Sequence, residues 1–363
     1  MVVIDNSDGS DGHFEGDMSA PGKASRPSAP TMLDVARRAG VSAMTVSRAL
    51  RDGASIAPAT RKRIIKAVEE VGYVLDLSAQ SLVSRRTAFI AALIPSINNS
   101  NFADTTRGIT EVLEASSIQL LLGYTDYSIE NEERLIEAML RRRPEGVIVT
   151  GGMHTARSRR LLHQASIPIV EMWDLPARPI QHVVGFSNAA AAGALVRYLY
   201  KRGYRKIGFI GGTSSRDERG AERRAGYETA LKELGLRVPR VISIATPPIS
   251  MRHGSEAVVR LIEQTPDVEA AMCTSDLPAF GAIMECSRRG WAVPKRIAIA
   301  GFGDFEVASC CEPTITTVGV NCLGIGRQAA KLMLRAIEAA RRGHVIPPET
   351  VITEYEVIAR ESA

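Results

Sequence analysis

The sequence predicts an α/β protein with an N-terminal all-α helix-turn-helix headpiece and a larger core of parallel sheets. Two observations carry this prediction. Residues 31–72 contain three short helical patterns joined by tight turns, and residues 89–363 alternate strand patterns with helical ones. Such alternation is typical of parallel sheets with helices on both faces. The length of 363 residues suggests two or three domains, and a hydrophobic content of 45% is that of an ordinary globular chain.

The first 30 residues differ in composition from the rest of the chain. They are rich in Gly, Ser, Asp and Pro and hold few bulky apolar residues, so we expect a disordered extension. Met18 and Met32 are alternative start sites. The stretch before Met18 carries acids but no Lys or Arg, which is unlike a secretory signal.

The composition also argues against membrane and disulfide-rich proteins. The longest apolar runs, such as 89–95 and 147–152, are far shorter than the ~20 residues that a membrane span needs. The five cysteines include no C-x-x-C pair, which disfavours a zinc knuckle, and their odd number disfavours a disulfide scaffold. We therefore expect a cytoplasmic protein that does not contact a membrane.

Positive charge is concentrated in residues 31–88. The formal net charge of the whole chain is +5. Within residues 31–88 bases outnumber acids two to one, whereas residues 1–30 are net acidic. A short basic segment is a candidate polyanion-binding module, and the alternative is a solvated basic face.

Three helices are predicted within this basic segment. The first covers 34–39 after the possible cap Thr31, the second covers 43–51, and the third covers 58–71 with a stop at Gly72. One apolar face is expected on the third helix. It consists of Ile64, Ile65, Val68 and Val71.

The spacing of Ala36, Gly40 and Val46 predicts a helix-turn-helix. This motif needs a small residue where two helices cross, a glycine where the turn is left-handed, and an apolar anchor on the second helix. Ser42 is placed to cap the second helix and to leave its first turn free for a major groove. The alternative is an ordinary small helical bundle, but spacing, cap and charge together favour DNA binding.

The core has nine strand patterns, more than one sheet holds comfortably, so we expect two similar α/β lobes. Their ranges are 89–95, 119–124, 147–151, 168–173, 182–186, 206–211, 241–245, 270–274 and 296–301. No H-E-x-x-H, G-x-S-x-G or P-loop motif is present, and the histidines lack metal-ligand spacing. We therefore expect no enzyme activity, no metal and no cofactor.

These motifs resemble the lactose/galactose-repressor family of bacterial regulators. The matching headpiece stretches are Leu33–Ala36, Ala39–Ser42, Thr45–Arg48, Thr60–Arg61, Gly72–Tyr73 and Ala79–Leu82. The matching core stretches are Ala298–Phe302, Pro313–Thr317 and Arg360–Ser362. Several more resemble gluconate-operon repressors: 93–95, 101–103, 151–154, 170–174 and 184–188.

The resemblance implies that the second headpiece helix reads DNA. The implied DNA-contacting residues are Ser42, Ala43, Met44, Thr45, Ser47, Arg48, Thr60, Tyr73, Ala79 and Leu82. Arg48 suits a guanine edge or a phosphate, Met44 offers apolar contact, and the hydroxyls bond phosphates or act as local caps.

Residues 77–83 resemble the family's hinge helix, in which a leucine wedges into the minor groove. Leu82 is the matching residue, with plain core packing as its alternative. Residues 75–78 read Leu-Asp-Leu-Ser where Pro-Asn-Arg-Val is more typical, so the hinge entry and the minor-groove polar contacts depart from the family pattern here.

The resemblance further implies a core like the periplasmic sugar-binding proteins, with the ligand held between two lobes. The implied ligand-contacting residues are Asn101, Phe102, His154, Glu171, Arg223, Ser275 and Asp276. Arg223 suits a carboxylate, with a surface salt bridge as its alternative. Gly303 stands where the family often has an acid, and the absence of that carboxylate fits an acidic ligand. The alternative for Phe102 is core packing, and the alternative for His154 is a plain surface histidine.

We therefore expect a cytoplasmic homodimeric repressor that a small sugar acid, with gluconate as best candidate, releases from a double-stranded DNA operator. Its expected parts are an extension (1–30), a DNA-binding domain (31–74), a hinge (75–88) and an effector-binding and dimerisation core (89–363). The main alternative is a regulator of the same family that responds to another sugar or sugar phosphate, or that activates. A transport solute-binding protein and an α/β enzyme on sugar acids are weaker alternatives.

Overall fold

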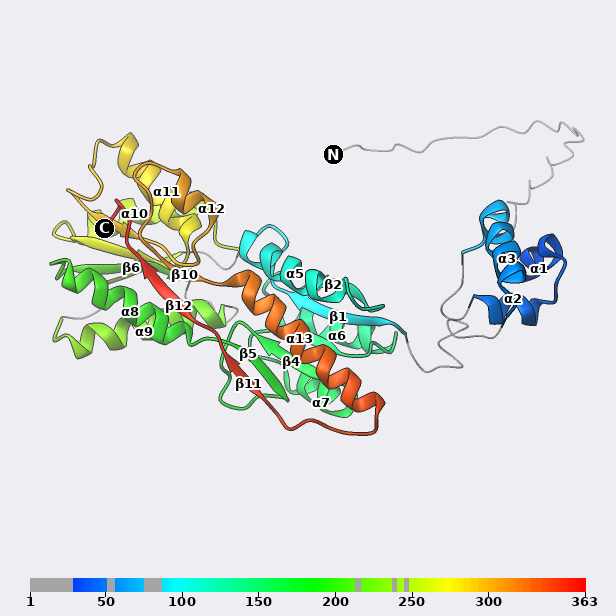
Figure 1. Ribbon diagram of the computed structural model, residues 1–363. Helices are drawn as coiled ribbons and strands as arrows, with labels where there is room; N and C mark the ends of the chain where they lie inside the picture. The colour runs from blue at the N-terminus through cyan, green and yellow to red at the C-terminus, as the bar shows by residue number, and fades with distance from the viewer. Residues whose placement is uncertain (1–28, 51–55, 75–86, 213–216, 237–239, 245–247) are drawn as a thin grey trace, which may run out of the picture. The chain divides into compact units, whose positions relative to one another are not determined.

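The computed structural model describes residues 29–50, 56–74, 87–212, 217–236, 240–244 and 248–363 (Figure 1). The chain divides into two compact units, Met1–Val83 and Ser84–Ala363, and each is described by itself. The predicted hinge helix, with Ala79 and Leu82, lies outside the described residues, and so does most of the predicted extension. Among the residues that the structure describes, no helix is long and apolar enough to cross a membrane.

The first unit contains three helices, α1 (Met32–Ala39), α2 (Ala43–Ala49) and α3 (Pro58–Val71). The predicted cap Thr31 forms a capping box with Asp34, and Gly40 ends α1 in the left-handed region at φ 62°. A small core is buried between the helices. Its fully or nearly fully buried members are Val35, Ala36, Ala39, Val46, Ala49, Ile64 and Ala67.

The predicted apolar face of α3 is wrong at one position. Ile64 is fully buried and Val68 and Val71 pack beside it, but Ile65 is 45% exposed. A residue next in sequence lies about 100° around a helix, so Ile65 cannot share the face that Ile64 buries. Ala67 occupies the inward position instead.

The first lobe of the core is built on a six-stranded parallel sheet of order β11-β5-β4-β3-β1-β2. Its strands are β1 (Phe89–Ile94), β2 (Gln119–Tyr124), β3 (Val147–Thr150), β4 (Ile169–Met172), β5 (His182–Gly185) and β11 (Thr350–Ile352). Its helices are α5 (Ser100–Leu113), α6 (Ile129–Leu140), α7 (Ala156–Gln164) and α13 (Cys322–Arg341).

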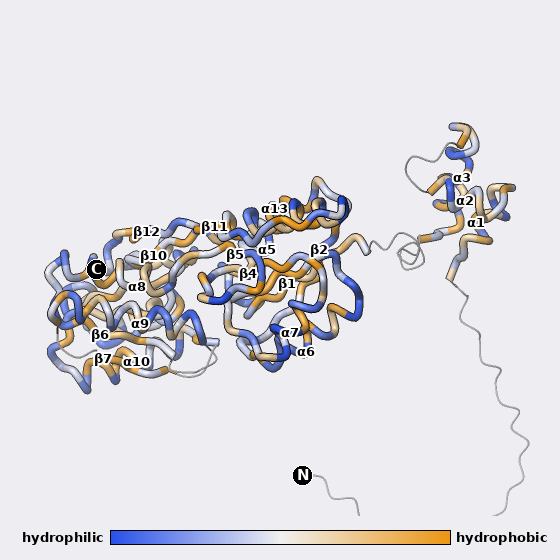
Figure 2. The backbone as a smooth tube through the Cα atoms, turned by 90° about the horizontal axis from the view of Figure 1, so that it is seen from below, coloured by the Kyte–Doolittle hydropathy of each residue, from blue (hydrophilic) through white to orange (hydrophobic). Residues whose placement is uncertain are grey.

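Strand β1 shows why the strands of this sheet have continuous apolar sequences. Its side chains alternate between two separate cores, Ile90 and Ile94 on the side of α5 and α13, and Ala91 and Leu93 on the side of α6 and α7. Both faces of a parallel sheet are covered, so neither face needs polar residues. Figure 2 shows the hydrophobic colouring along β1 and the polar colouring on the outer helices α6 and α7.

The second lobe is built on a four-stranded parallel sheet of order β7-β6-β8-β9. Its strands are β6 (Ile207–Gly212), β7 (Arg240–Ile244), β8 (Ala270–Cys273) and β9 (Ala298–Ala300). Its helices are α8 (Asn188–Lys201), α9 (Glu218–Glu233), α10 (Met251–Gln264), α11 (Asp276–Arg288) and α12 (Glu306–Cys310).

All nine predicted strand patterns form strands, and three further strands at the C-terminal end escaped the sequence analysis. Strands β10 (Thr317–Val320) and β12 (Tyr355–Ile358) form an antiparallel pair, and β11 joins the edge of the first sheet. Within the described residues the chain passes between the lobes three times, after β5, after β10 and after β11 (Figure 1). These three connections can act together as a hinge about which the lobes open and close.

Candidate functional site

The exposed face of α2 carries the predicted base-reading residues. Met44 is 65% exposed and Arg48 is exposed one turn further along, so both side chains point to the same side of the helix. Ser42 is the N-cap, because its Oγ accepts a hydrogen bond from the Thr45 backbone N–H at 3.2 Å. The hydroxyls of Ser42 and Thr45 also lie 2.8 Å apart and form a hydrogen bond at the start of α2. Ala43 is partly buried beside them.

Helix α3 begins without a side-chain cap. Ala57 makes no capping hydrogen bond, and Pro58 stands at the first turn. Thr60 is partly exposed in that turn, and Ser47 on α2 is likewise half-buried. Tyr73 packs against the headpiece core, so at least part of its ring serves to hold the three helices together.

A cavity of about 600 Å³, its open mouth included, lies between the two lobes of the core. Its walls come from the carboxyl ends of strands in both lobes, where open α/β sheets bind ligands. The first lobe contributes Asn99, Asn101, Phe102, Tyr127 and Trp173. The second lobe contributes Asp217, Arg219, Arg223, Ile249, Thr274, Ser275, Leu277, Phe302, Gly303 and Phe305.

Aromatic rings form one wall of the cavity. The ring of Trp173 lies 5.1 Å from that of Phe102 and 6.2 Å from that of Phe186, and Phe186 stacks on Phe302 at 6.4 Å. The Trp173 indole N–H donates to Thr105 Oγ1 at 3.1 Å, which fixes the ring within the first lobe. This wall offers flat apolar surfaces on which a sugar ring or chain can pack.

Arg223 is held firmly at the second-lobe side. Its Nε donates to Asn188 Oδ1 at 2.9 Å, one terminal nitrogen donates to the Thr274 carbonyl at 2.8 Å, and its guanidinium lies 3.8 Å from the centre of the Phe302 ring. Burial lowers the pKa of Arg223 to about 10, so the side chain stays charged at neutral pH. Its remaining N–H groups are available to a ligand.

Arg219 also lines the cavity, and the sequence analysis did not single it out. Only 9% of the residue is exposed. Its guanidinium lies 5.5 Å from the centre of the Phe102 ring and close to Gly151 of the opposite lobe. Its position four residues before Arg223, one helical turn away on the same face of α9, is the signal that could have found it.

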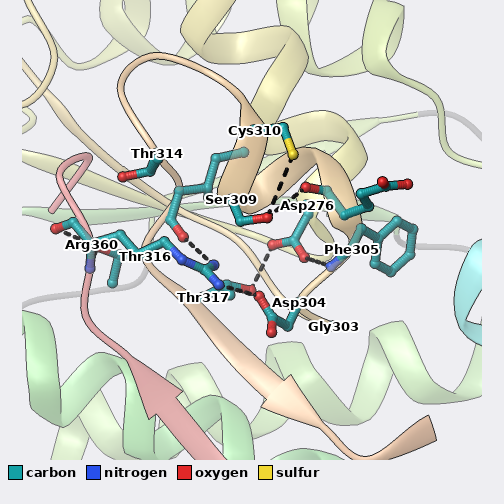
Figure 3. A network of polar contacts seen from close by, with 12 residues as sticks. Asp276, Gly303, Asp304, Phe305, Ser309, Cys310, Thr314, Thr316, Thr317 and Arg360 are labelled. Atoms are coloured by element: carbon teal, nitrogen blue, oxygen red, sulfur yellow. Dashed lines mark hydrogen bonds and ion pairs between the residues drawn. The ribbon is translucent and has the colours of Figure 1, made fainter. Parts of the chain in front are cut away.

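The predicted ligand residue Asp276 lies behind the cavity wall rather than on it. Asp276 is fully buried, and Figure 3 shows its carboxylate between two donors. Thr317 Oγ1 donates to one oxygen at 2.6 Å, and the Phe305 backbone N–H donates to the other at 2.8 Å. Burial raises the pKa of Asp276 to about 6 despite these bonds. Asp276 therefore positions the loop after β9, while its neighbour Ser275 faces the cavity.

Gly303 connects the two lobes at the cavity. Its carbonyl accepts a hydrogen bond from Asn101 Nδ2 at 3.0 Å, and its φ of 118° is one that L side chains rarely adopt. A Cβ there would lie 2.6 Å from the Asn101 amide. Any side chain at this position would therefore strain the backbone and crowd the Asn101 amide. Asp304, next in sequence, pairs with Arg360 at 2.6 Å (Figure 3).

His154 and Glu171 do not reach the cavity. The His154 side chain is fully buried, with Nδ1 2.6 Å from a Glu132 oxygen and Nε2 3.4 Å from a Glu171 oxygen. Burial opposes the charged imidazole, but the hydrogen bonds and charges of the two carboxylates outweigh it and raise the pKa of His154 to about 9. His154 lies in the loop after β3, and its two carboxylate partners come from α6 and β4, so it holds these three segments together.

A second contact between the lobes was also missed. One oxygen of Glu218, at the start of α9, accepts hydrogen bonds from the backbone N–H groups of Gly152 at 3.2 Å and Met153 at 2.9 Å. Beside it, Glu222 of the second lobe faces Asp174 of the first. Burial and the negative charge of Asp174 raise the pKa of Glu222 to about 7.

The fold and these sites define a class of protein, a DNA-binding regulator with a two-lobed core and a cavity between the lobes. The profile of bacterial regulatory proteins of the lacI family matches residues 31–76, and the profile of periplasmic binding protein-like domains matches residues 196–363. HTH-type transcriptional regulator GntR of Pseudomonas aeruginosa is 35% identical over 333 residues, covering 92% of this chain and 95% of that protein.

Solved structures agree with these matches. A lacI-family transcriptional regulator from Silicibacter pomeroyi is 32% identical with a TM-score of 0.85, over 92% of this chain and 99% of that one. The lac repressor dimer bound to operator shares the fold at 20% identity, with a TM-score of 0.77 over 92% of this chain and 98% of that one. The chain belongs to the lacI family of bacterial regulatory proteins and is a DNA-binding transcriptional regulator, as the sequence predicted.

Proposed function

We propose that the protein is a homodimeric repressor that a small sugar acid, with gluconate as best candidate, releases from its operator. The observation that carries the proposal is the cavity between the lobes, where the buried Arg219 and the half-buried Arg223 face an aromatic wall. Guanidinium groups suit a carboxylate, and flat rings suit the carbon chain of a sugar. The similarity to GntR regulators supports the same ligand class.

The operator is read by the headpiece in this proposal. Arg48 and Met44 on the exposed face of α2 contact base edges, and the hydroxyls at its start fix the register on phosphates. The dimeric arrangement is supported by the lac repressor, whose operator complex is a dimer of the same fold. Two headpieces then read two halves of a pseudo-palindromic site.

Effector binding acts through closure of the lobes. A ligand in the cavity touches Asn101 and Phe102 of the first lobe and Arg223 and Ser275 of the second, so it favours the state in which both walls are close together. A ligand shifts an equilibrium only by its differential affinity for the two states. In this proposal, closure of the core lowers the affinity of the two headpieces for the operator, and operator binding in turn disfavours closure. Residues 75–88 serve as the hinge between the DNA-binding segment 31–74 and the core 89–363.

The experiment that tests the proposal is fluorescence anisotropy of a labelled promoter fragment from beside the protein's own gene. Protein is titrated with and without gluconate, with glucose as the neutral control and scrambled DNA as the sequence control. We expect salt-sensitive binding that gluconate, but not glucose, weakens by about 5- to 150-fold, the usual range of allosteric coupling. Binding that no sugar acid changes would contradict the proposed effector, and tighter binding with gluconate would contradict the proposed direction.

A further inference from the structure

We infer that Arg219 makes the effector site selective for anions, and that the site takes a monoanionic sugar acid rather than a neutral sugar or a dianion. This inference rests on the proposed function, because it concerns the chemistry of the same cavity. It differs from the sequence-based assignment, which gave carboxylate capture to Arg223.

The Arg219 guanidinium is buried without a partner among the described residues. Arg219 lines the cavity and is nine-tenths buried, yet among the described residues it has no hydrogen-bond acceptor and no ion-pair partner. A buried charge without a partner is costly, and proteins normally pair it. The cavity is where the missing partner fits, because the Arg219 side chain lines it beside the Phe102 ring and close to Gly151.

The neighbouring acids are already committed to other groups. Asp217 accepts from the Gly220 backbone N–H as the cap of α9. Glu218 accepts from two backbone N–H groups of the opposite lobe, and Glu222 faces Asp174. These acids act on Arg219 only at longer range, so a ligand carboxylate meets a guanidinium whose N–H groups are free within the described part of the chain.

Arg223 differs from Arg219 in this respect. Its Nε and one terminal nitrogen already donate to Asn188 and Thr274, and one face of its plane is covered by Phe302. The two-pronged approach through Nε is therefore closed to a carboxylate. Arg223 keeps N–H groups suited to a hydroxyl or to one carboxylate oxygen, while Arg219 keeps its whole donor set.

The charge of the cavity wall sets the charge of the ligand. The formally charged residues of the wall are Arg219, Arg223 and Asp217, a net charge of +1. One carboxylate brings the occupied cavity to zero. A second anionic group adds uncompensated negative charge close to Asp217, which disfavours a dianion.

The test is isothermal titration calorimetry of the full chain with a panel of hexonates including gluconate, with glucose as neutral probe and with glucarate as dianionic probe. The wild-type protein should bind at least one hexonate more tightly than either other probe. Arg219→Gln should weaken hexonate binding by about 10- to 100-fold, the value of one charge-assisted interaction, and leave glucose binding unchanged. Arg219→Lys should restore part of the anion preference.

Arg224→Gln is the matched control on the same helix, because Arg224 pairs with Glu228 and does not line the cavity. Retained operator binding by each variant reports an intact fold. An Arg219→Gln protein with the wild-type preference for hexonate over glucose would overturn the inference alone. Wild-type protein that binds no hexonate would overturn the proposed function and this inference with it, and preference for glucarate would overturn the monoanion assignment.

Discussion

At the residue scale, we expect the carboxyl groups between the lobes to make effector binding depend on pH. Glu222 and Asp174 come from opposite lobes, so their proximity exists only while the lobes are together. Glu218 adds negative charge beside them, and Arg219 partly offsets it. Burial and the Asp174 charge raise the pKa of Glu222 from the ordinary 4.5 to about 7. The closed core thus holds a proton that a solvated carboxyl releases.

The sign of the pH effect follows from this difference. Below about pH 4.5 Glu222 is protonated in both states, and closure carries no cost from it. As the pH rises from there to about 7, the open state loses its proton first, so closure becomes less favourable; above that range the penalty is constant. Effector affinity should therefore fall between about pH 5 and pH 7, measured by calorimetry with gluconate.

Glu222→Gln tests the assignment, because glutamine keeps the shape and cannot ionise. Its effector affinity should be nearly independent of pH across that range and equal to the low-pH affinity of the wild type. Glu233→Gln, further along α9 and paired with Arg197, is the control that should keep the wild-type profile. A Glu222→Gln protein with the same pH slope as the wild type would remove Glu222 from this role.

The residue scale is also where sequence reasoning was least complete. Polar residues that follow strands were natural candidates, and the structure places Asn101, Phe102, Arg223 and Ser275 around the cavity; their contact with an effector stays a prediction. His154 and Asp276 occupy equivalent places after strands, but each turns toward a partner far away in the sequence. The partners are Glu132 and Thr317, and no local sequence pattern indicates that they contact His154 and Asp276.

At the element scale, α2 is the part of the protein to which we assign sequence-specific DNA binding. Its cap, its buried anchor Val46 and its exposed Arg48 were all predicted, because a helix-turn-helix is a local structure with fixed spacing. The C-terminal strands β10 and β12 were not predicted. Their antiparallel pairing joins segments more than thirty residues apart, and the sequence of a short strand does not indicate its partner.

Arg48→Ala tests the recognition helix. Arg48 is exposed and its removal leaves no buried group unpaired, so the headpiece should fold normally. Operator affinity should fall by about 1–3 kcal/mol, and affinity for scrambled DNA should fall much less, because a lost base contact acts on the specific site. Anisotropy with both DNAs measures the difference. Unchanged operator binding, with circular dichroism showing an intact fold, would exclude Arg48 from base reading.

At the scale of the whole molecule, the chain forms two separate compact units, and we assign operator binding to the first and effector binding to the second. The alternation of βα units and the local spacing of the headpiece were sufficient to predict both units and the two-lobed core. The contacts between lobes could not be predicted, because Asn101–Gly303 and Glu218–Gly152 join residues distant in sequence through backbone groups that no side-chain pattern marks. These contacts are what an effector is expected to stabilise.

Coupling between the two units is the central claim, and thermodynamic reciprocity tests it most directly. The measurement is the affinity of the full chain for gluconate, first without DNA and then saturated with its operator fragment, by calorimetry in the same buffer. If effector and operator favour different states, operator must weaken gluconate binding by the same factor by which gluconate weakens operator binding. Equal gluconate affinity with and without operator would contradict the account.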